Sequence, residues 1–313
     1  WPRWIWRRPA RHAGIQRTRI AVSPDPASDA PTAVTLPPLR EIIAQYGLGA
    51  RRSLGQHFLF DLNLTRRIAR EAGPLTGRTV VEIGPGPGGL TRSLLESDAK
   101  RIVAIERDAR CIEALGILTA AYPERLEIVE ADALTVNPAA AAGTDEPCII
   151  VANLPYNIGT RLLIDWLRDL AGIQSMTLMF QKEVADRILA PPGASGFGRL
   201  SVITQWLCDV RRLFDIPAQA FVPPPKVQST VIQLTPRQEP LAPAEFKDVE
   251  AITAAAFGQR RKMLRSALRS LDVDALPLLE AAGIRPDLRA ETLSVEEFCA
   301  LARALKAARA AKA

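Results

Sequence analysis

The chain has 313 residues, 48% of them apolar and 24% charged, which is enough apolar material for one large core or two modest ones and excludes a chain disordered throughout. No stretch approaches the roughly 18 to 20 uninterrupted apolar residues of a membrane span, and the start lacks the apolar run of a secretory signal, so we expect no membrane insertion or export. Four scattered cysteines and two histidines argue against a metal site and favour a reducing, cytoplasmic environment.

The opening of the chain accounts for the formal net charge of +6, because the first 24 residues hold six arginines and no acid. The remainder has 34 basic and 34 acidic residues, so a polyanion would have to bind through a local basic patch. Seven of the 25 prolines lie within the first 38 residues. We therefore predict a disordered basic leader over residues 1–37, arising from a start codon assigned too far upstream or from an organelle transit peptide.

From Leu39 onward, short apolar runs alternate with stretches of helical period. We expect helices over 39–48, 64–73, 90–97 and 109–122, and strands over 79–84, 101–106, 126–131, 148–154 and 176–181. The strand runs are β-branched and apolar on both faces, as in strands covered by helices on both sides. The alternation predicts an α/β fold with a parallel, doubly wound sheet.

The last strand-like run is 229–236. The turn 221–226 before it is too short for a crossover helix, so we expect this strand to pair antiparallel at the edge of the sheet. After about Pro236 the composition shifts to Ala, Leu and Arg, with helical period over 243–271, 276–283 and 294–311. The chain is thus predicted to contain the leader 1–37, an α/β domain over 38–236 and a smaller helical domain over 237–313.

A glycine-rich turn, VVEIGPGPGGLT, lies directly after a buried strand and before a helix, where doubly wound sheets bind ligands. Gly84, Gly86 and Gly89 satisfy G-x-G-x-x-G, and Glu106 follows 22 residues after Gly84. This is also the dinucleotide pattern, so the glycines alone do not choose between NAD and another adenosine cofactor.

Three acids favour S-adenosylmethionine. Glu82 precedes the loop, where it would repel a pyrophosphate but attract a sulfonium and an ammonium group. Glu106 can accept hydrogen bonds from both ribose hydroxyls, and Asp132 from the adenine amino group. The alternative for Glu106 and Asp132 is a solvated strand-end carboxylate or a helix N-cap.

The tetrapeptide Asn153-Leu154-Pro155-Tyr156 follows the fourth strand and fits an acceptor site for an exocyclic amine. The Asn153 side-chain oxygen and the Leu154 carbonyl could accept two N–H protons and stabilise charge that develops on nitrogen. Pro155 restricts Leu154 to extended geometry, and Tyr156 offers a face on which a base can stack. The alternative is an Asx-Pro turn with a packed tyrosine.

These motifs resemble those of the rRNA adenine N6,N6-dimethyltransferases, from about residue 39 to the C-terminus. The residues that carry the resemblance, in order, are SLGQHFL at 53–59, VEIGPGPGGLT, Glu106, Asp132, NLPY, FQKEVA at 180–185 and FVPPPKVQS at 221–229. Within this family, the motifs are similar to those of the bacterial enzymes that dimethylate two adjacent adenosines near the 3′ end of small-subunit (16S) rRNA. The resemblance implies a Rossmann-like class I methyltransferase domain over 38–236, with a mostly parallel seven-stranded sheet.

The resemblance also assigns roles to individual residues. It implies that a set of residues contacts S-adenosylmethionine or borders its pocket: His57, Leu59, Gly84, Glu106, Asp132 and Asn153. It places Tyr156 and Phe221 on either side of the target base. His57 is a departure, because many relatives have Asn there, and this leaves its contact with the methionine carboxylate open.

A basic stretch in the helical region is the predicted RNA-binding surface. Between Ala251 and Leu271 there are five cations and no acid: Arg260, Arg261, Lys262, Arg265 and Arg269. On a helix, Arg261, Arg265 and Arg269 would form one stripe opposite a stripe of leucines, so one face could be buried while the other meets phosphates. The alternative is a solvated helix face.

The expected function is therefore dimethylation of adenosine N6 in small-subunit rRNA during ribosome biogenesis. We expect the substrate within an immature 30S particle, and a monomeric, cytoplasmic enzyme. Three alternatives stay open: a large-subunit rRNA adenine methyltransferase of the antibiotic-resistance type, a non-catalytic assembly or transcription factor, and an NAD-dependent dehydrogenase. The segment 221–229 and the long helical C-terminus favour the small-subunit enzyme.

Overall fold

The computed structural model describes residues 17–18, 36–49 and 57–312. Most of the predicted leader, residues 1–16 and 19–35, lies outside the described residues, as does most of the SLGQHFL motif. Within the described ranges, no helix is both long and apolar enough to cross a bilayer.

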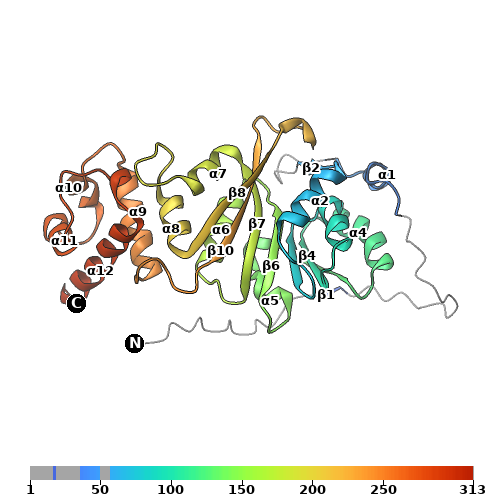
Figure 1. Cartoon of the computed structure of the whole chain (residues 1–313), viewed down its shortest axis with the longest axis horizontal. Coiled ribbons are helices and arrows are strands. Elements are labelled where there is room, and N and C mark those ends of the chain that lie inside the picture. The colour runs from blue at the N-terminus through green and yellow to red at the C-terminus, as the bar shows by residue number, and fades with distance from the viewer. Residues whose placement is uncertain (1–16, 19–35, 50–56, 313) are drawn as a thin grey trace.

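One twisted sheet organises the molecule, with strand order β1-β5-β4-β3-β6-β7-β10-β8 (Figure 1). Its strands are β1 Arg17–Thr18, β3 Thr79–Ile83, β4 Arg101–Glu106, β5 Leu126–Glu130, β6 Cys148–Asn153, β7 Ile173–Gln181, β8 Cys208–Ile216 and β10 Ser229–Pro236. Strands β5, β4, β3, β6 and β7 are parallel, which confirms the expected doubly wound sheet. The chain runs from β3 outward to β5 and returns to β6, so the strand order reverses between β3 and β6.

Helices fill the connections and cover both faces of the sheet. They are α1 Leu39–Gln45, α2 Leu62–Glu71, α3 Gly89–Leu95, α4 Ala109–Ala121, α5 Pro138–Ala142, α6 Gly159–Leu167, α7 Lys182–Leu189 and α8 Arg199–Leu207, with short 3₁₀ turns η2 Ala133–Thr135 and η3 Ala218–Ala220. Alternate residues of one strand point to opposite faces, so Val81 packs in the core with α5, α6 and α8, whereas Val80 packs in the core with α2, α3 and α4.

Strand β10 pairs antiparallel with β7, as expected, but it does not lie at the edge of the sheet. The edge belongs to β8, which pairs antiparallel with the other side of β10. This strand was not among those expected from the sequence. Its charged residues are exposed while Cys208, Phe214 and Ile216 are buried, and charged side chains are common on edge strands because they discourage pairing with other chains.

A second, two-stranded sheet joins distant parts of the chain beside the main one. Strand β2, Phe58–Leu59, pairs antiparallel with β9, Phe221–Val222. This pairing brings the segment after His57 against the FVPPPKVQS motif.

The C-terminal helices gather at one end of the molecule, next to α8 (Figure 1). They are α9 Phe246–Gly258, α10 Leu264–Ala267, α11 Ala275–Ala281 and α12 Val295–Lys312, with η4 Leu268–Ser270 and η5 Ala290–Thr292. Helix α12 packs along α9, and Phe298 of α12 stacks on Phe257 of α9 with ring centroids 5.4 Å apart.

The stretch 243–271, predicted to be helical, does not form one helix, so the basic stripe along one helix is wrong. Helix α9 ends at Gly258, and α10 begins only at Leu264. Between them, the backbone at Met263 forms a β-bridge with Arg289, and the Leu264 N–H donates to the Leu288 carbonyl. These tertiary hydrogen bonds replace the helical ones. Leu264 is nevertheless buried, as the spacing indicated.

Candidate active site

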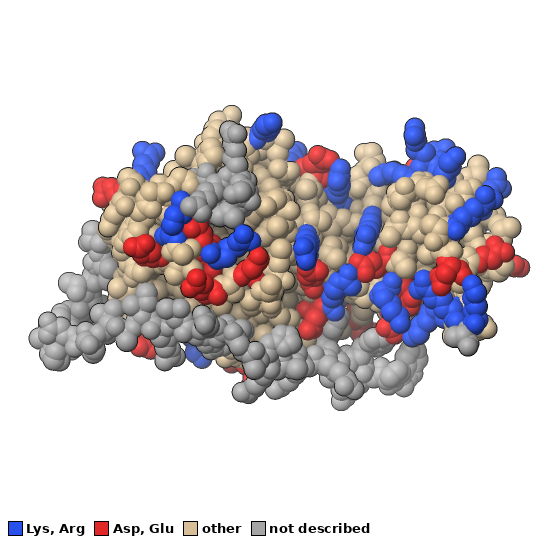
Figure 2. Space-filling view, turned by 180° about the vertical axis from the view of Figure 1, so that it is seen from behind, with Lys and Arg blue, Asp and Glu red and all other residues tan. Residues whose placement is uncertain are grey.

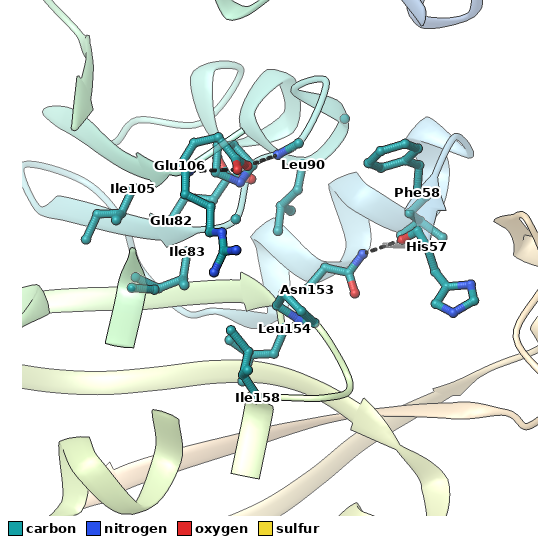
Figure 3. A pocket seen from close by; sticks show the side chains of 18 of the residues that line it. His57, Phe58, Glu82, Ile83, Leu90, Ile105, Glu106, Asn153, Leu154 and Ile158 are labelled. Atoms are coloured by element: carbon teal, nitrogen blue, oxygen red, sulfur yellow. Dashed lines mark hydrogen bonds between the residues drawn. The ribbon is translucent and has the colours of Figure 1, made fainter. Parts of the chain in front are cut away.

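A pocket opens at the carboxyl ends of β3, β4 and β6, beside the point where the strand order reverses (Figure 3). Parallel α/β sheets bind ligands at this position. Most of the site residues predicted from sequence line it: His57, Leu59, Glu82, Gly84, Gly86, Glu106, Asp132, Asn153, Leu154, Pro155 and Tyr156. Apolar residues that the sequence analysis did not single out complete the lining, among them Phe58, Leu90, Ile105 and Ile158.

The glycine turn brings backbone close to the pocket wall. Gly86 has φ +56°, a left-handed conformation that side chains disfavour, and its N–H donates to Glu106 Oε2 at 3.1 Å. Gly89 opens α3, and a Cβ there would lie 2.7 Å from the backbone oxygen of Leu59. The turn therefore needs glycine both for its conformation and for its contact with β2.

Glu106 is held rigidly by backbone donors. Oε1 accepts from the N–H groups of Arg107 and Asp108 at 2.8 and 2.9 Å, and Oε2 accepts from Gly86. Burial raises the pKa of Glu106, and these three hydrogen bonds oppose the rise. A carboxylate offers about four acceptor positions, so roughly one, on Oε2, is left for a ribose hydroxyl. A second hydroxyl would have to share a position with a backbone N–H.

Glu82 is the most deeply buried acid of the pocket. It is 1% exposed, its Oε2 has no hydrogen-bond partner among the residues that the structure describes, and burial raises its pKa to about 8. The nearby Glu106 carboxylate acts in the same direction. A buried carboxyl with one unpartnered oxygen, beside a second carboxyl, is a poor neighbour for a pyrophosphate and a good one for a cation. The site thus fits a cofactor that carries sulfonium and ammonium groups.

Asp132 also lies in the lining, and it caps a short helix. Its Oδ1 accepts from the Leu134 N–H at 3.0 Å, and its Oδ2 from Arg107 Nη1 at 2.8 Å. The N-cap that the sequence analysis gave as the alternative is therefore present. A contact with an adenine amino group stays a prediction.

Asn153 is oriented by a single hydrogen bond. Its Nδ2 donates to the backbone oxygen of His57 at 3.1 Å, which fixes the side-chain oxygen in the opposite direction (Figure 3). Within the described part of the chain, that oxygen has no hydrogen-bond partner. The amide oxygen is therefore placed to accept a hydrogen bond from a ligand N–H group, as the acceptor motif requires.

Tyr156 is held at both its ring and its hydroxyl. The hydroxyl lies 2.5 Å from Ser229 Oγ, and the ring stacks against the His57 imidazole with centroids 5.2 Å apart and an interplanar angle of 29°. Burial raises the pKa of Tyr156. His57 Nδ1 in turn lies 2.8 Å from the Pro223 carbonyl. Sequence reasoning missed these contacts because they join positions far apart in the chain, although the 221–229 motif pointed to the right segment.

Phe221 does not line the pocket. It is 1% exposed and pairs through β9 with Leu59. A contact between Phe221 and a target base therefore stays a prediction.

The predicted RNA-binding residues lie away from the pocket, between α9 and η4 (Figure 2 shows the basic side chains over this end of the molecule). Arg260 is half-buried and lies 3.5 Å from Glu291. The other four are exposed: Arg261, Lys262, Arg265 and Arg269. Among the described residues, no cluster of His, Cys, Asp and Glu could hold a metal ion.

Comparison with known proteins gives consistent results. The sequence profile of the family described as ribosomal RNA adenine dimethylase matches residues 47–307. A protein of Paramagnetospirillum magneticum named ribosomal RNA small subunit methyltransferase A is 62% identical over 272 residues, which cover 87% of this chain and 96% of that protein. Its namesake in Rhodospirillum rubrum is 59% identical over 87% of this chain and 94% of its own length.

Two solved structures share the architecture. A dimethyladenosine transferase from Plasmodium falciparum superposes with a TM-score of 0.68 at 25% identity, covering 78% of this chain and 96% of that one. The 23S rRNA methyltransferase ErmE superposes with a TM-score of 0.59 at 29% identity, covering 80% and 99%.

The described sheet has seven longer strands, one of them antiparallel, and the pocket lies where the strand order reverses. This arrangement defines a methyltransferase that uses S-adenosylmethionine. Within that class, the chain belongs to the ribosomal RNA adenine dimethylase family. It is an rRNA adenine dimethyltransferase.

Proposed function

We propose that the chain dimethylates N6 of two adjacent adenosines near the 3′ end of small-subunit (16S) rRNA. The observation that carries this proposal is Asn153, whose amide nitrogen is engaged by the His57 carbonyl so that its oxygen is left for an exocyclic amine. The names and high identity of the bacterial relatives support the small subunit as the substrate.

The residues of the chain act mainly by orientation. S-adenosylmethionine, when bound, would supply the methyl group of its sulfonium: the bond from sulfur to the methyl breaks, the sulfur leaves as a neutral thioether, and N6 gains the methyl and loses one proton. The Asn153 side-chain oxygen and the Leu154 carbonyl accept the two N–H groups of the amine, which turns its lone pair toward the methyl and stabilises charge on nitrogen. Glu82 would face the cationic part of the cofactor, and Glu106 and Asp132 would hold its ribose and adenine.

The wider assignment follows from the same motifs. We assign Tyr156 and Phe221 to the target base. We assign the basic residues from the end of α9 to η4 to rRNA phosphates. The α/β part 38–236 and the helical part 237–313 form separate domains. The substrate is an immature 30S particle, and the enzyme is a cytoplasmic monomer. The mixture of exposed basic and acidic groups suits one shaped RNA target better than indiscriminate RNA binding (Figure 2).

The test is transfer of tritiated methyl groups to purified ribosomal particles. Immature small subunits that lack the modification should accept close to four methyl groups each, recovered as N6,N6-dimethyladenosine, whereas large subunits should accept none. The similarity to ErmE favours large-subunit rRNA as the second candidate. Label in 23S rRNA and none in 16S rRNA would establish that candidate instead.

The Asn153→Ala variant tests the mechanism. Removing one transition-state hydrogen bond typically lowers the rate by about 10²- to 10³-fold, and we expect a kcat reduction of roughly this size. Asn63→Ala, an exposed asparagine on α2, serves as the control and should retain wild-type activity. An Asn153→Ala enzyme with wild-type kcat would refute the proposed role.

A further inference from the structure

Arg107 ties together the two carboxylates that the proposed function gives to the adenosine part of the cofactor. Its backbone N–H donates to Glu106 Oε1 at 2.8 Å, and its side-chain Nη1 donates to Asp132 Oδ2 at 2.8 Å. The parallel pairing of β4 with β5 brings the two strand ends together, since Glu106 lies opposite Glu130. Arg107 also lines the pocket. The sequence analysis did not single it out, because its partner Asp132 lies 25 positions further along the chain.

The ion pair completes the orientation of the Asp132 carboxylate. Oδ1 accepts from the Leu134 N–H at 3.0 Å, which fixes one oxygen, and Arg107 fixes the other. A carboxylate has about four acceptor positions, so roughly one on each oxygen is left for a further donor. Because both oxygens are held, these positions point in set directions, and an amino group of a ligand would meet an acceptor that is already oriented.

The ion pair is too exposed to add much to folding stability. The side chains of Arg107 and Asp132 are 51% and 35% exposed, and water screens pairs of this kind. An adenine ring placed over them would exclude water and strengthen both the ion pair and the hydrogen bond to its amino group. Loss of Arg107 should therefore show in ligand binding rather than in the free energy of unfolding.

Arg107 also divides the charge of the pocket. Among the described residues that line the pocket, it is the only lysine or arginine, and it accompanies three acids, Glu82, Glu106 and Asp132. Strand β4 lies between β5 and β3, so Asp132, after β5, and Glu82, on β3, lie on opposite sides of β4. The guanidinium neutralises the Asp132 end and leaves the Glu82 end to a cation. A neutral adenine and a positively charged sulfonium would each meet a matching end.

We propose that Arg107 is a positioning residue of the cofactor site. It holds Asp132 in the orientation in which the carboxylate accepts from the adenine amino group, and it keeps that end of the pocket neutral. The inference rests on the proposed function, to which the contact between Asp132 and adenine belongs.

Calorimetric titration of the full-length protein with 5′-methylthioadenosine reports on this end of the pocket, because the ligand has adenine and ribose but neither sulfonium nor ammonium. We expect Arg107→Leu to weaken its binding by about fivefold, the size of one hydrogen bond. The matched control is Arg101→Leu, which removes the ion pair with Glu127 near the amino ends of the same two strands. Its Kd should stay within about twofold of wild type, since the altered pair lies away from the pocket.

A double-mutant cycle separates positioning from direct contact. If Arg107 acts through Asp132, combining Arg107→Leu with Asp132→Asn weakens methylthioadenosine by no more than about twofold beyond Asp132→Asn alone. Losses that multiply would show that Arg107 acts independently of Asp132 and would overturn the inference. An Arg107→Leu protein with the wild-type Kd would overturn it as well.

A second ligand tests the neutralising role. In Arg107→Leu the Asp132 charge is no longer balanced and attracts cations, so S-adenosylmethionine should lose less affinity than methylthioadenosine. A general disturbance of the fold would weaken both ligands equally, and equal losses contradict the inference. At saturating cofactor, kcat should stay within about twofold of wild type, because Arg107 takes no part in methyl transfer. A larger loss of kcat would also contradict it.

The proposed function can fail separately, since both ligands are titrated without RNA. Wild-type enzyme that labels only large subunits refutes the 16S assignment and leaves the role of Arg107 standing. An Asp132→Asn protein that binds both ligands as tightly as wild type refutes the adenine contact, and the inference with it.

Discussion

The two buried carboxyls of the pocket differ in what surrounds them. Glu106 accepts hydrogen bonds from three backbone N–H groups, whereas no other described residue bonds Oε2 of Glu82. A carboxyl with a pKa of about 8 is largely protonated near pH 7 and ionises when a cation binds beside it. Glu82 is therefore the residue through which pH should act on both stability and cofactor binding.

Without cofactor, the protein should lose stability as pH rises from about 4.5 to about 8. In this window the folded state keeps the Glu82 proton, while the unfolded state, with its pKa near 4.5, releases it, so the unfolded state binds fewer protons. In Glu82→Gln, the decrease of Tm over this pH range should be smaller by several degrees, since a change of 1 kcal/mol in the free energy of unfolding shifts Tm by roughly 2–4 °C for a domain of this size. The exposed Glu124→Gln should follow the wild type; parallel profiles for all three proteins would contradict the assignment.

Cofactor affinity should change with pH in the opposite sense. A cationic ligand stabilises ionised Glu82, so binding releases a proton, and the Kd for S-adenosylmethionine should fall by up to about tenfold per pH unit as pH rises toward 8. Glu82→Gln should bind more weakly and lose most of this dependence. Isothermal titrations in buffers of different ionisation enthalpy would also reveal the released proton; no proton release by the wild type would exclude this coupling.

Single elements are constrained by contacts that no local pattern encodes. Helix α3 begins at Gly89 directly against the Leu59 carbonyl, and helix α10 begins at Leu264, directly after Met263 pairs with Arg289. In both cases a backbone partner distant in sequence decides where a helix begins or ends.

The start of α3 can be tested by adding one methyl group. Gly89→Ala would place a Cβ 2.7 Å from the Leu59 oxygen, and because backbone cannot move aside cheaply, we expect a loss of about 1–3 kcal/mol in the free energy of unfolding. Gly116→Ala lies within α4, and outside its own helix backbone and chain neighbours no described atom lies within 4 Å of the added Cβ, so it should instead stabilise by about 0.5–1 kcal/mol. Urea denaturation measures both, and a Gly89→Ala protein as stable as wild type would show that the contact relaxes.

At the scale of the whole molecule, charge is divided between two regions. The pocket at the carboxyl ends of the strands is acidic, while exposed cations occupy the turn after α9 and the start of the next helices. This separation lets a cationic cofactor and a polyanionic RNA be attracted to different parts of one formally balanced surface.

The RNA surface predicts a specific salt dependence. Replacing both Arg261 and Lys262 by Ala should weaken binding to small-subunit particles and reduce the slope of log K against log salt by about one per lost phosphate contact, or about two in total. Lys100→Ala is the matched control, because Lys100 is exposed at the start of β4, at the opposite end of the strand from Glu106. An unchanged slope in the double variant would exclude this surface from RNA binding.

The sequence determined the α/β architecture, because period-two and period-3.6 patterns depend only on neighbours along the chain. It also located the glycine turn, its acids and the Asn153 tetrapeptide, since these features lie within a few residues of a strand end. The edge strand β8 was missed because its exposed side is charged. The helical stretch predicted over 243–271 is interrupted because the backbone at Met263 pairs with Arg289.

Only the tertiary structure decided which groups meet. The stacking of His57 on Tyr156 and the burial of Phe221 depend on pairing between segments more than 160 residues apart, as the hydrogen bond from His57 to Pro223 spans 166 positions. Such contacts follow from the packing of the whole chain, in which burial and backbone pairing outweigh local preference, and no periodic pattern records them.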